Sequence, residues 1–300
     1  MIRKILLGIL KKLKFLPPKL YVKIYYEYYM GSKLSLENPK GFNEKIQWLK
    51  VFYKPEILTQ LVDKYAVRAY VKEKIGERYL NELLCVTNAS KDISFKDLPN
   101  EFVVKGTHGC NFNLIVKDKS KVNKVKAKLL FKKWLSKNQY YRGGLEWAYK
   151  NVPPRLIVEK FMHDKENEVL LDYKFYCFDG KPTYVQVDIG RGRIHDRYFY
   201  DMKWKKQAFV KGSFNITSDE LSKPINFDKM VELAEKLAGN FPFVRVDLYN
   251  LSGKIVFGEM TFYPGDGRQP FNPIKFEHEI GNLLNLPKIP KNASFIHTVN

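Results

Sequence analysis

Hydrophobic and polar positions follow two different periods along the chain from residue 38 onward. Apolar residues recur at helical spacing in four segments, so we predict helices over residues 44–53, 58–74, 122–136 and 226–239. Short apolar or alternating runs predict strands over residues 102–105, 114–116, 156–161, 173–178, 182–188, 241–249 and 254–261. No internal repeat or low-complexity tract interrupts this pattern. Helices and strands are mixed throughout, which indicates an α+β or α/β protein.

The first 33 residues have a pattern of their own, with eight lysines or arginines and one acid, Glu27. A nearly helical apolar stripe precedes Pro17 and Pro18, and consists of Ile2, Ile5, Leu6, Ile9, Leu10, Leu13 and Leu16. Lys11 and Lys12 break this run far short of the roughly 20 residues of a membrane span, and a small-residue cleavage site of a secretory signal is missing. Two interpretations remain: an amphipathic helix packed on the protein body, or an interfacial helix on anionic lipid.

The composition is typical of a globular protein except in its charge. Hydrophobic residues at 45% and charged residues at 28% exclude a disordered chain, and 300 residues allow one large or two compact domains. The 52 Lys and Arg against 32 Asp and Glu leave a net charge of +20, which indicates an anionic partner. Cys85, Cys110 and Cys177 are odd in number and widely spaced, so we expect a reducing compartment, the cytoplasm.

The most informative segment is the strand pair 241–249 and 254–261, which predicts a hairpin. A three-residue loop with Gly253 in the left-handed position would place Asn250 opposite Lys254. In that register Arg245 faces Glu259, and Asp247 is the diagonal neighbour of Glu259 at about 7 Å. The other face is expected to be a core surface of Val244, Val246, Leu248, Val256, Gly258 and Met260, whereas Ile255, Phe257 and Thr261 share the face of Asp247.

Two carboxylates at this separation can share Mg²⁺, and the neighbouring arginine can bind a phosphate or carboxylate. The alternative is an ordinary Arg–Glu pair on a half-exposed sheet, and a slip of one residue in the register would move Glu259 to the other face. The glycine turn at residues 263–267 follows this strand directly, and such a turn lets a backbone approach a ligand closely.

A second glycine segment, residues 106–113, joins the strands 102–105 and 114–116 into a predicted hairpin. Its backbone N–H groups could cover phosphates, and Lys105 would supply a point charge, although the chain has no Walker A motif. His108 is either a catalytic or phosphate-contacting group, or a hydrogen-bonded loop histidine.

Two later segments add candidate binding residues. The strand that ends in Glu159, Lys160 and Phe161 could offer its backbone edge to an adenine base while Glu159 accepts the exocyclic N–H. Asp172 and Lys174 alternate with aromatic residues, so we expect them to face a cleft; ordinary surface charges are the alternative.

Taken in order, these pieces resemble the ATP-grasp superfamily. Arg245-Val246-Asp247, Glu259-Met260-Thr261 and Pro264-Gly265 are similar to a run in D-alanine–D-alanine ligases, which carry Asn where Thr261 stands. A closer resemblance is to the TupA-like ATP-grasp family of bacterial capsule and teichuronopeptide gene clusters, over roughly residues 36 to 287. It rests on residues 38–45, 63–65, 172–175, 242–249 and 257–267.

The resemblance implies an α+β protein of the ATP-grasp fold, in which two subdomains enclose an Mg-ATP cleft. The expected parts are a basic amphipathic segment (1–35), an N-terminal subdomain (36–100), a lid subdomain (101–160) and a C-terminal subdomain with the metal hairpin (161–300). The implied metal ligands are Asp247, Glu259 and Thr261. The implied catalytic residues are Arg245, Lys105 and His108. The implied ATP-binding residues are Lys64, Lys105, Gly109, Cys110, Asn111, Glu159, Lys160, Phe161, Asp172 and Lys174.

The implied activity is that of an ATP-dependent carboxylate–amine ligase that works through an acyl phosphate. Its substrates would be an amine and an anionic saccharide or other carboxylate. Arg191, Arg193 and Arg197 could hold this carboxylate; the alternative is that they are exposed loop arginines. The protein would modify a cell-surface polysaccharide precursor in the cytoplasm, at the inner face of the membrane, with residues 1–33 as the contact to anionic lipid.

Three alternatives belong to other classes. A glycosyltransferase that uses a nucleotide sugar is one, although the metal-dependent type usually shows Asp-x-Asp, which this chain lacks. A nucleic-acid-binding protein is the second, on charge alone. Nucleic acid is nevertheless not an expected partner, because the basic residues gather in the N-terminal segment and in residues 117–137 without a recognised fold motif. A non-catalytic membrane-surface scaffold is the third.

Overall fold

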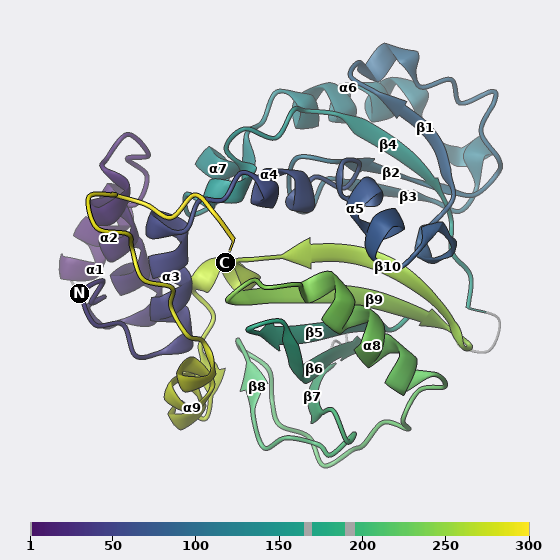
Figure 1. The fold of residues 1–300 in the computed structure, drawn as a ribbon. Helices are drawn as coiled ribbons and strands as arrows, with labels where there is room; N and C mark the ends of the chain where they lie inside the picture. Colours follow the sequence, from purple (N-terminus) through teal and green to yellow (C-terminus); the bar gives the residue numbers. More distant parts are fainter. Residues whose placement is uncertain (1, 165–169, 190–195, 300) are drawn as a thin grey trace.

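The computed structural model describes residues 2–164, 170–189 and 196–299, which form two α+β units with a helical segment at one end (Figure 1). The N-terminal part begins with three helices, α1 (Ile2–Leu10), α2 (Pro18–Met30) and α3 (Phe42–Phe52). The Glu44 side chain accepts the backbone N–H groups of Lys40 and Gly41 at 2.8 and 2.9 Å, which caps the first turn of α3. None of the described helices has the length and hydropathy needed to cross a lipid bilayer.

The helix predicted over residues 58–74 is broken in two, α4 (Ile57–Val62) and α5 (Val67–Lys74). The carboxylate of Asp63 accepts the backbone N–H groups of Tyr65 and Ala66 at 2.9 and 3.3 Å. Such local side-chain bonds compete with the helical ladder, and here they form a turn that carries the half-buried Lys64. The short 3₁₀ helix η1 (Glu77–Tyr79) follows.

The smaller sheet is a four-stranded antiparallel sheet in the order β1-β4-β2-β3. Its strands are β1 (Leu83–Thr87), β2 (Phe102–Gly106), β3 (Asn113–Val116) and β4 (Leu156–Lys160). β1 therefore belongs to this sheet although it precedes residue 101, where the lid subdomain was expected to begin. The helix α6 (Lys124–Leu135) covers the sheet with Phe131 and Trp134, while its lysines face solvent. The connecting elements are η2 (Ser90–Asp92), η3 (Lys119–Lys121), α7 (Gln139–Arg142) and η4 (Trp147–Tyr149).

The larger sheet has five antiparallel strands in the order β10-β9-β5-β6-β7. They are β5 (Asp172–Phe178), β6 (Lys181–Ile189), β7 (Asp196–Asp201), β9 (Phe243–Leu251) and β10 (Lys254–Thr261). The helix α8 (Phe227–Ala238) packs on one face, where Phe227 stacks on Phe175 at 6.0 Å between ring centroids. The remaining elements are β8 (Val210–Lys211), η5 (Pro264–Gly267), β11 (Phe271–Asn272) and α9 (Lys275–Leu283).

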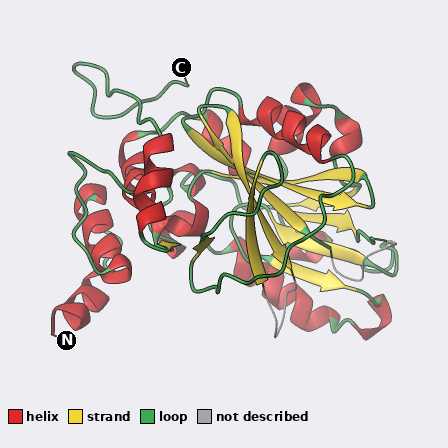
Figure 2. Cartoon of the chain, turned by 90° about the horizontal axis from the view of Figure 1, so that it is seen from below, coloured by secondary structure: helices red, strands yellow, loops and turns green. Residues whose placement is uncertain are grey.

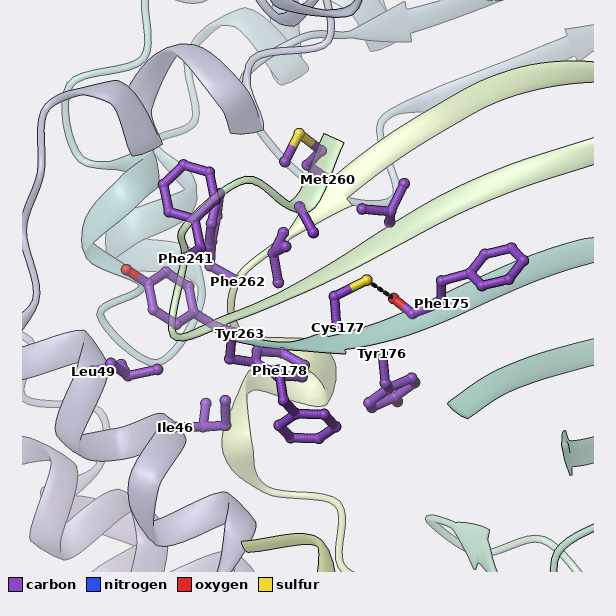
Figure 3. Packing of buried hydrophobic residues seen from close by; sticks show 14 of the residues in the cluster. Ile46, Leu49, Phe175, Tyr176, Cys177, Phe178, Phe241, Met260, Phe262 and Tyr263 are labelled. Carbon is purple, nitrogen blue, oxygen red and sulfur yellow. Dashed lines mark hydrogen bonds between the residues drawn. The ribbon is translucent and has the colours of Figure 1, made fainter. Parts of the chain in front are cut away.

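The core of the larger unit is continuous with the N-terminal helices. Figure 3 shows part of this cluster, in which Ile46 and Leu49 of α3 belong to the same buried group as Phe178 and Tyr263. Seen from below, the helices α1 to α3 lie at the edge of the molecule, beside the strands (Figure 2). The helical segment is therefore anchored through α3, and α1 is its outermost part.

The β9–β10 hairpin departs from the predicted register in two places. Its loop has two residues, Ser252 and Gly253, both with positive φ (49° and 97°), so Lys254 pairs with Leu251 and not with Asn250. A bulge between Phe257 and Glu259 then adds one more residue. A Cβ on Gly258 would lie 3.0 Å from the backbone oxygen of Asp247, which explains the glycine at this bulge.

The two departures restore the face on which the site depends. The loop shifts the register by one residue and places Phe257 opposite Leu248, on the core face, so the faces predicted for residues 255–257 are wrong. The bulge adds a second residue, and Glu259 returns to the face of Asp247, directly opposite it. Thr261 lies opposite Arg245, so Arg245 and Glu259 are diagonal neighbours, contrary to the prediction.

Candidate active site

Four polar side chains of the β9–β10 hairpin meet on one face of the larger sheet. Arg245 donates from Nε and Nη2 to the two carboxylate oxygens of Asp247 at 2.7 and 2.6 Å. The same Nη2 lies 3.3 Å from Glu259 Oε1 and 3.1 Å from Thr261 Oγ1. This arrangement follows from strand pairing, because side chains of paired residues share a face.

The pKa values of the two carboxylates, Asp247 and Glu259, are shifted in opposite directions. Burial raises the pKa of Asp247 to about 7, and the neighbouring carboxylates of Asp172 and Glu259 act in the same direction against Arg245 and Lys174. For Glu259, burial opposes ionisation, but Lys64, Arg245 and Lys174 outweigh it and lower the pKa to about 2. Asp247 is therefore a buried carboxylate that gains from an additional positive charge.

The residues fit Mg²⁺ as an ion shared with a nucleotide. Among the residues that the structure describes, no group of three or more His, Cys, Asp or Glu side chains is placed to enclose a metal ion. Mg²⁺ is commonly held by one or two carboxylates together with substrate phosphates and water. Asp247 and Glu259, directly opposite each other, are such a pair of oxygen ligands, and the raised pKa of Asp247 favours a cation beside it. The hydroxyl of Thr261 lies 3.3 Å from Glu259 Oε1 and can complete the set.

Two lysines predicted to contact phosphate lie next to this carboxylate pair and on the lid. Lys64 Nζ is 3.5 Å from Glu259 Oε2 and donates to the backbone oxygen of Gly109 at 3.0 Å. Lys105 Nζ lies 2.6 Å from Glu159 Oε2, and Arg68 Nη1 lies 3.5 Å from the other carboxylate oxygen, Glu159 Oε1. The smaller sheet therefore presents positive charge toward the cleft, with Glu159 holding two of the cations in place.

An apolar cavity of about 310 Å³ lies beside Lys105, between the smaller sheet and the hairpin. Its lining combines apolar side chains with a few cations and amides: Val103, Ile115, Phe161, Met162, Leu170 and Tyr249, with Asn81, Lys105, Asn113, Lys117 and Lys160. Such a mixture suits a flat, mainly apolar base that continues into a charged group. Phe161, expected at the base-binding hinge, is part of this lining.

The backbone edge of β4 is less available than the sequence suggested. β4 is an inner strand, paired with β1 on one side and β2 on the other. The N–H of Lys160 donates to Glu82 O at 3.0 Å, and the Lys160 carbonyl accepts from Asn81 Nδ2 at 2.9 Å. A base would therefore bind past the end of β4, and Glu159 is engaged by Lys105 and Arg68.

A row of paired residues extends the polar face across the larger sheet. Lys174 lies opposite Asp247 on β9 and opposite Gln186 on β6. Its Nζ contacts Asp172 at 2.5 Å and Asp188 at 2.8 Å. Burial alone would lower the pKa of Lys174, but the carboxylates of Asp172, Asp247 and Asp188 raise it. Asp172 and Lys174 thus share the polar face of Asp247, and their orientation toward a cleft stays a prediction.

Arg197 continues this row, with its Nε 2.7 Å from Asp188 Oδ1 and its Nη1 2.8 Å from the backbone oxygen of Lys211. Arg191 and Arg193, the other arginines considered for an acidic substrate, lie outside the described residues. The pair of Lys174 and Arg197 around Asp188 was not predicted, since it depends on the pairing of β5, β6 and β7.

The glycine loop forms the predicted hairpin, but its histidine is not exposed. His108 is 1% exposed, its Nε2 is 2.9 Å from Trp134 O, and its ring packs on Phe112. These contacts correspond to the hydrogen-bonded loop histidine and not to a group presented to a substrate. The backbone oxygen of Cys110 accepts from Arg142 at 2.7 Å, while Asn111 stands at the exposed tip with φ 60°.

A buried carboxyl beside the loop escaped sequence analysis. Glu146 is 7% exposed, and its Oε2 accepts from Gln139 Nε2, which also lies 3.2 Å from Cys110 Sγ. Burial, followed by the charge of Asp266, raises the pKa of Glu146 to about 8. Residues 139–146 have no periodic pattern that distinguishes this glutamate from a surface charge, so only the fold reveals it.

Two α+β units that present cations and carboxylates to a common cleft define an ATP-grasp protein, the fold class of ATP-dependent ligases. The chain belongs to the TupA-like ATP-grasp family, whose sequence profile matches residues 44–285. This match confirms the resemblance and the α+β ATP-grasp fold expected from the sequence. No curated protein matches the chain significantly.

Solved structures with a similar fold are distant in sequence. D-alanine–D-alanine ligase from Bacillus anthracis, complexed with ATP, shares 15% identity at a TM-score of 0.39 over 69% of this chain and 55% of that one. The Helicobacter pylori D-alanine–D-alanine ligase shares 15% identity at a TM-score of 0.42, over 82% and 69% of the two chains. The ATP-grasp ligase PsnB, complexed with a minimal precursor, shares 10% identity at a TM-score of 0.42, over 81% and 66%. The chain thus spans about half the length of the first of these ligases.

Proposed function

We propose that the protein is an ATP-dependent carboxylate–amine ligase that works through an acyl phosphate. The observation that carries this proposal is the placement of Asp247 and Glu259 directly opposite each other and beside Arg245, with Lys64 at 3.5 Å from Glu259. Family membership supports it, because an ATP-grasp site needs cations for phosphates and carboxylates for Mg²⁺ on facing surfaces.

The residues divide the work between two surfaces. Lys105, Lys64 and Lys174 would hold the phosphates of ATP, and the cavity that ends at Phe161 would hold its base. Asp247 and Glu259, with Thr261, would hold Mg²⁺, which supplies charge neutralisation to the transferred phosphoryl group. Arg245 would stabilise the negative charge of the phosphoryl group in the transition state, since its planar guanidinium can donate two hydrogen bonds to phosphate oxygens.

The reaction would then have two steps, phosphorylation of the carboxylate and formation of the amide. A carboxylate oxygen of the first substrate attacks the γ-phosphorus of ATP, and ADP leaves with the electron pair of the broken P–O bond. The amine attacks the acyl carbon, inorganic phosphate leaves, and the ammonium proton passes to a base. The loop at residues 106–113 would exclude water, which would otherwise hydrolyse the acyl phosphate.

We further propose that the carboxylate belongs to a cell-surface polysaccharide or its precursor, and that the amine is an amino acid or amino sugar. The reaction would take place in the cytoplasm at the inner face of the membrane. The net charge of +20 supports an anionic substrate. Of the three arginines considered for this substrate, Arg197 lies within the described residues, where its guanidinium pairs with Asp188.

Thermal unfolding with and without Mg-ATP tests the nucleotide site. A ligand at about 100 times its Kd stabilises a protein by about 2.7 kcal/mol, so we expect the Tm to rise by several degrees only when Mg²⁺ is present. Glu259→Gln should lose the Mg²⁺-dependent part of the rise. Glu235→Gln, at an exposed position of α8, is the matched control and should keep it. A rise with a nucleotide sugar and none with ATP would contradict the ligase and favour a glycosyltransferase.

A further inference from the structure

The helix α1 turns its apolar stripe away from the rest of the protein. The relative exposures of Ile2, Ile5, Leu6 and Ile9 are 82%, 60%, 54% and 57%, and no residue of α1 is buried. At 100° per residue these four side chains fall within an arc of about 100° on the helix surface. A helix of a soluble protein normally buries such a stripe, so this one is oriented the wrong way for packing on its own chain.

The opposite side of α1 makes the contacts with the protein body. A Cβ on Gly8 would lie 3.3 Å from the ring of Tyr28, which shows how closely α2 approaches there. Lys11 lies over the Tyr28 ring, with its Nζ 4.1 Å from the centroid, and donates to the Tyr29 hydroxyl at 3.0 Å. α1 is thus held on the body by Gly8 and by Lys11 just after the helix, and Leu16, the last residue of the stripe, packs against the core, whereas Ile2, Ile5, Leu6 and Ile9 are left exposed.

The surroundings of the stripe are positively charged. Lys4 and Lys12 of the same segment are exposed, and the single acid of residues 1–33, Glu27, is paired with Arg3 at 2.6 Å. Phe15, 82% exposed, adds an aromatic side chain directly after α1. This combination is complementary to an anionic lipid surface and repels a second copy of the same chain.

We propose that α1 docks on an anionic bilayer as an interfacial helix, with Ile2, Ile5, Leu6 and Ile9 inserted below the headgroups. This inference rests on the membrane location given under the proposed function and names the residues that produce it. The helix lies in the plane of the membrane, because its nine residues are far too short to span a bilayer. The lysines remain at headgroup level, where each adds about fivefold to the binding constant.

Docking at α1 also fixes which end of the cleft faces the membrane. Lys14, directly after α1, donates to the backbone oxygen of Gly143 at 2.5 Å, and the Tyr25 hydroxyl of α2 donates to Asp266. Gly143 follows α7 directly and Asp266 belongs to η5, which comes after β10; α7 lies near the end of β10, opposite the tip of the β9–β10 hairpin (Figure 1). A bilayer on α1 therefore lies nearest the turn at residues 263–267, and a membrane-held acceptor would enter from that end.

Vesicle binding of the full chain tests the proposal. We expect the wild type to sediment with vesicles of equal parts phosphatidylglycerol and phosphatidylcholine, and not with vesicles of phosphatidylcholine alone. Ile5→Ser combined with Ile9→Ser leaves the charge unchanged and should weaken binding at least tenfold, since each buried methylene accounts for about fourfold. The matched control is Ile225→Ser combined with Ile274→Ser, two exposed isoleucines elsewhere, which should bind as the wild type does.

A second pair of variants separates this site from general attraction by lysines. Lys4→Gln with Lys12→Gln should weaken binding about twentyfold at low salt, whereas Lys124→Gln with Lys133→Gln on α6 should leave most of it. Equal binding by the Ile5/Ile9 variant, or a loss confined to the α6 variant, would overturn the proposal. The proposal would also be overturned if the wild type eluted as a dimer in gel filtration and the Ile5/Ile9 variant as a monomer. The rise in Tm that Mg-ATP causes should be the same in each variant as in the wild type. If no protein, wild type included, showed this rise, the ligase proposal would be contradicted, while the vesicle result would stand.

Discussion

Lys64 lies between the glycine loop (residues 106–113) and the β9–β10 hairpin: its Nζ donates to Gly109 O at 3.0 Å and lies 3.5 Å from Glu259 Oε2. The turn made by Asp63 between α4 and α5 sets this position. One ammonium group therefore connects three segments that are far apart in the sequence. We therefore expect the position of the glycine loop and the charge beside Glu259 to be coupled through this residue.

Lys64→Met should weaken Mg-ATP binding about tenfold or more, because it removes a charge-assisted contact worth about 1.5–3 kcal/mol. Isothermal titration calorimetry measures this directly. Lys124→Met on α6 is the control, since that lysine is exposed and belongs to the same unit as the lid loop. Unchanged affinity in Lys64→Met would mean that the lysine serves only the free protein.

Arg245→Lys should destabilise the protein by about 1–3 kcal/mol, because a lysine cannot reproduce the two-pronged contact with the buried carboxylate of Asp247. Urea unfolding gives the free energy. Arg78→Lys, at an exposed position, should stay within about 0.5 kcal/mol of the wild type. A similar stability for both variants would show that Asp247 does not depend on the fork.

Glu146→Gln should change how stability depends on pH. In the folded protein the pKa of Glu146 is raised to about 8, mainly by burial, while in the unfolded chain it is about 4.3. Between these values the folded state binds more protons, so rising pH destabilises the wild type and this loss is complete only above pH 8.

From pH 6 to pH 9, the wild type should therefore lose at least about 1 kcal/mol more stability than Glu146→Gln, as measured by urea unfolding at each pH. Glu220→Gln, an exposed position, should follow the wild-type profile. Parallel profiles of Glu146→Gln and the wild type would show that this carboxyl is already ionised at neutral pH.

Glu277→Gln should destabilise the fold by about 1–3 kcal/mol. The Glu277 carboxylate is 4% exposed and accepts the backbone N–H groups of Asn43 and Phe271 at 2.5 and 3.1 Å, and Asn43 Nδ2 at 3.0 Å. An amide NH₂ would face one of these donors and leave it unpaired. Glu279→Gln, exposed on the same helix, is the control for urea unfolding, and an equal effect in both would contradict a role for this network.

Local pattern was sufficient to predict most helices and strands of the ATP-grasp body. The period of 3.6 residues located α3, α6 and α8 within a few residues, because each buries one face. It failed at Asp63, where side-chain bonds to the backbone break the helix, and α9, β1 and β7 were missed because their patterns are short and irregular. The hairpin at residues 243–261 was predicted, but its loop and bulge were not.

The sequence by itself determined which residue types are available for the site: Arg245, Asp247 and Glu259 follow from a motif of alternating residues on two neighbouring strands. Only the tertiary structure decided which of them meet, because the bulge at Gly258 sets Glu259 opposite Asp247 and the Asp63 turn brings Lys64 to Glu259. It also decided that His108 is buried, that Glu146 lies in the interior, and that the apolar stripe of α1 faces outward. Such facts depend on contacts between distant segments, which hydrophobic period and local propensity do not encode.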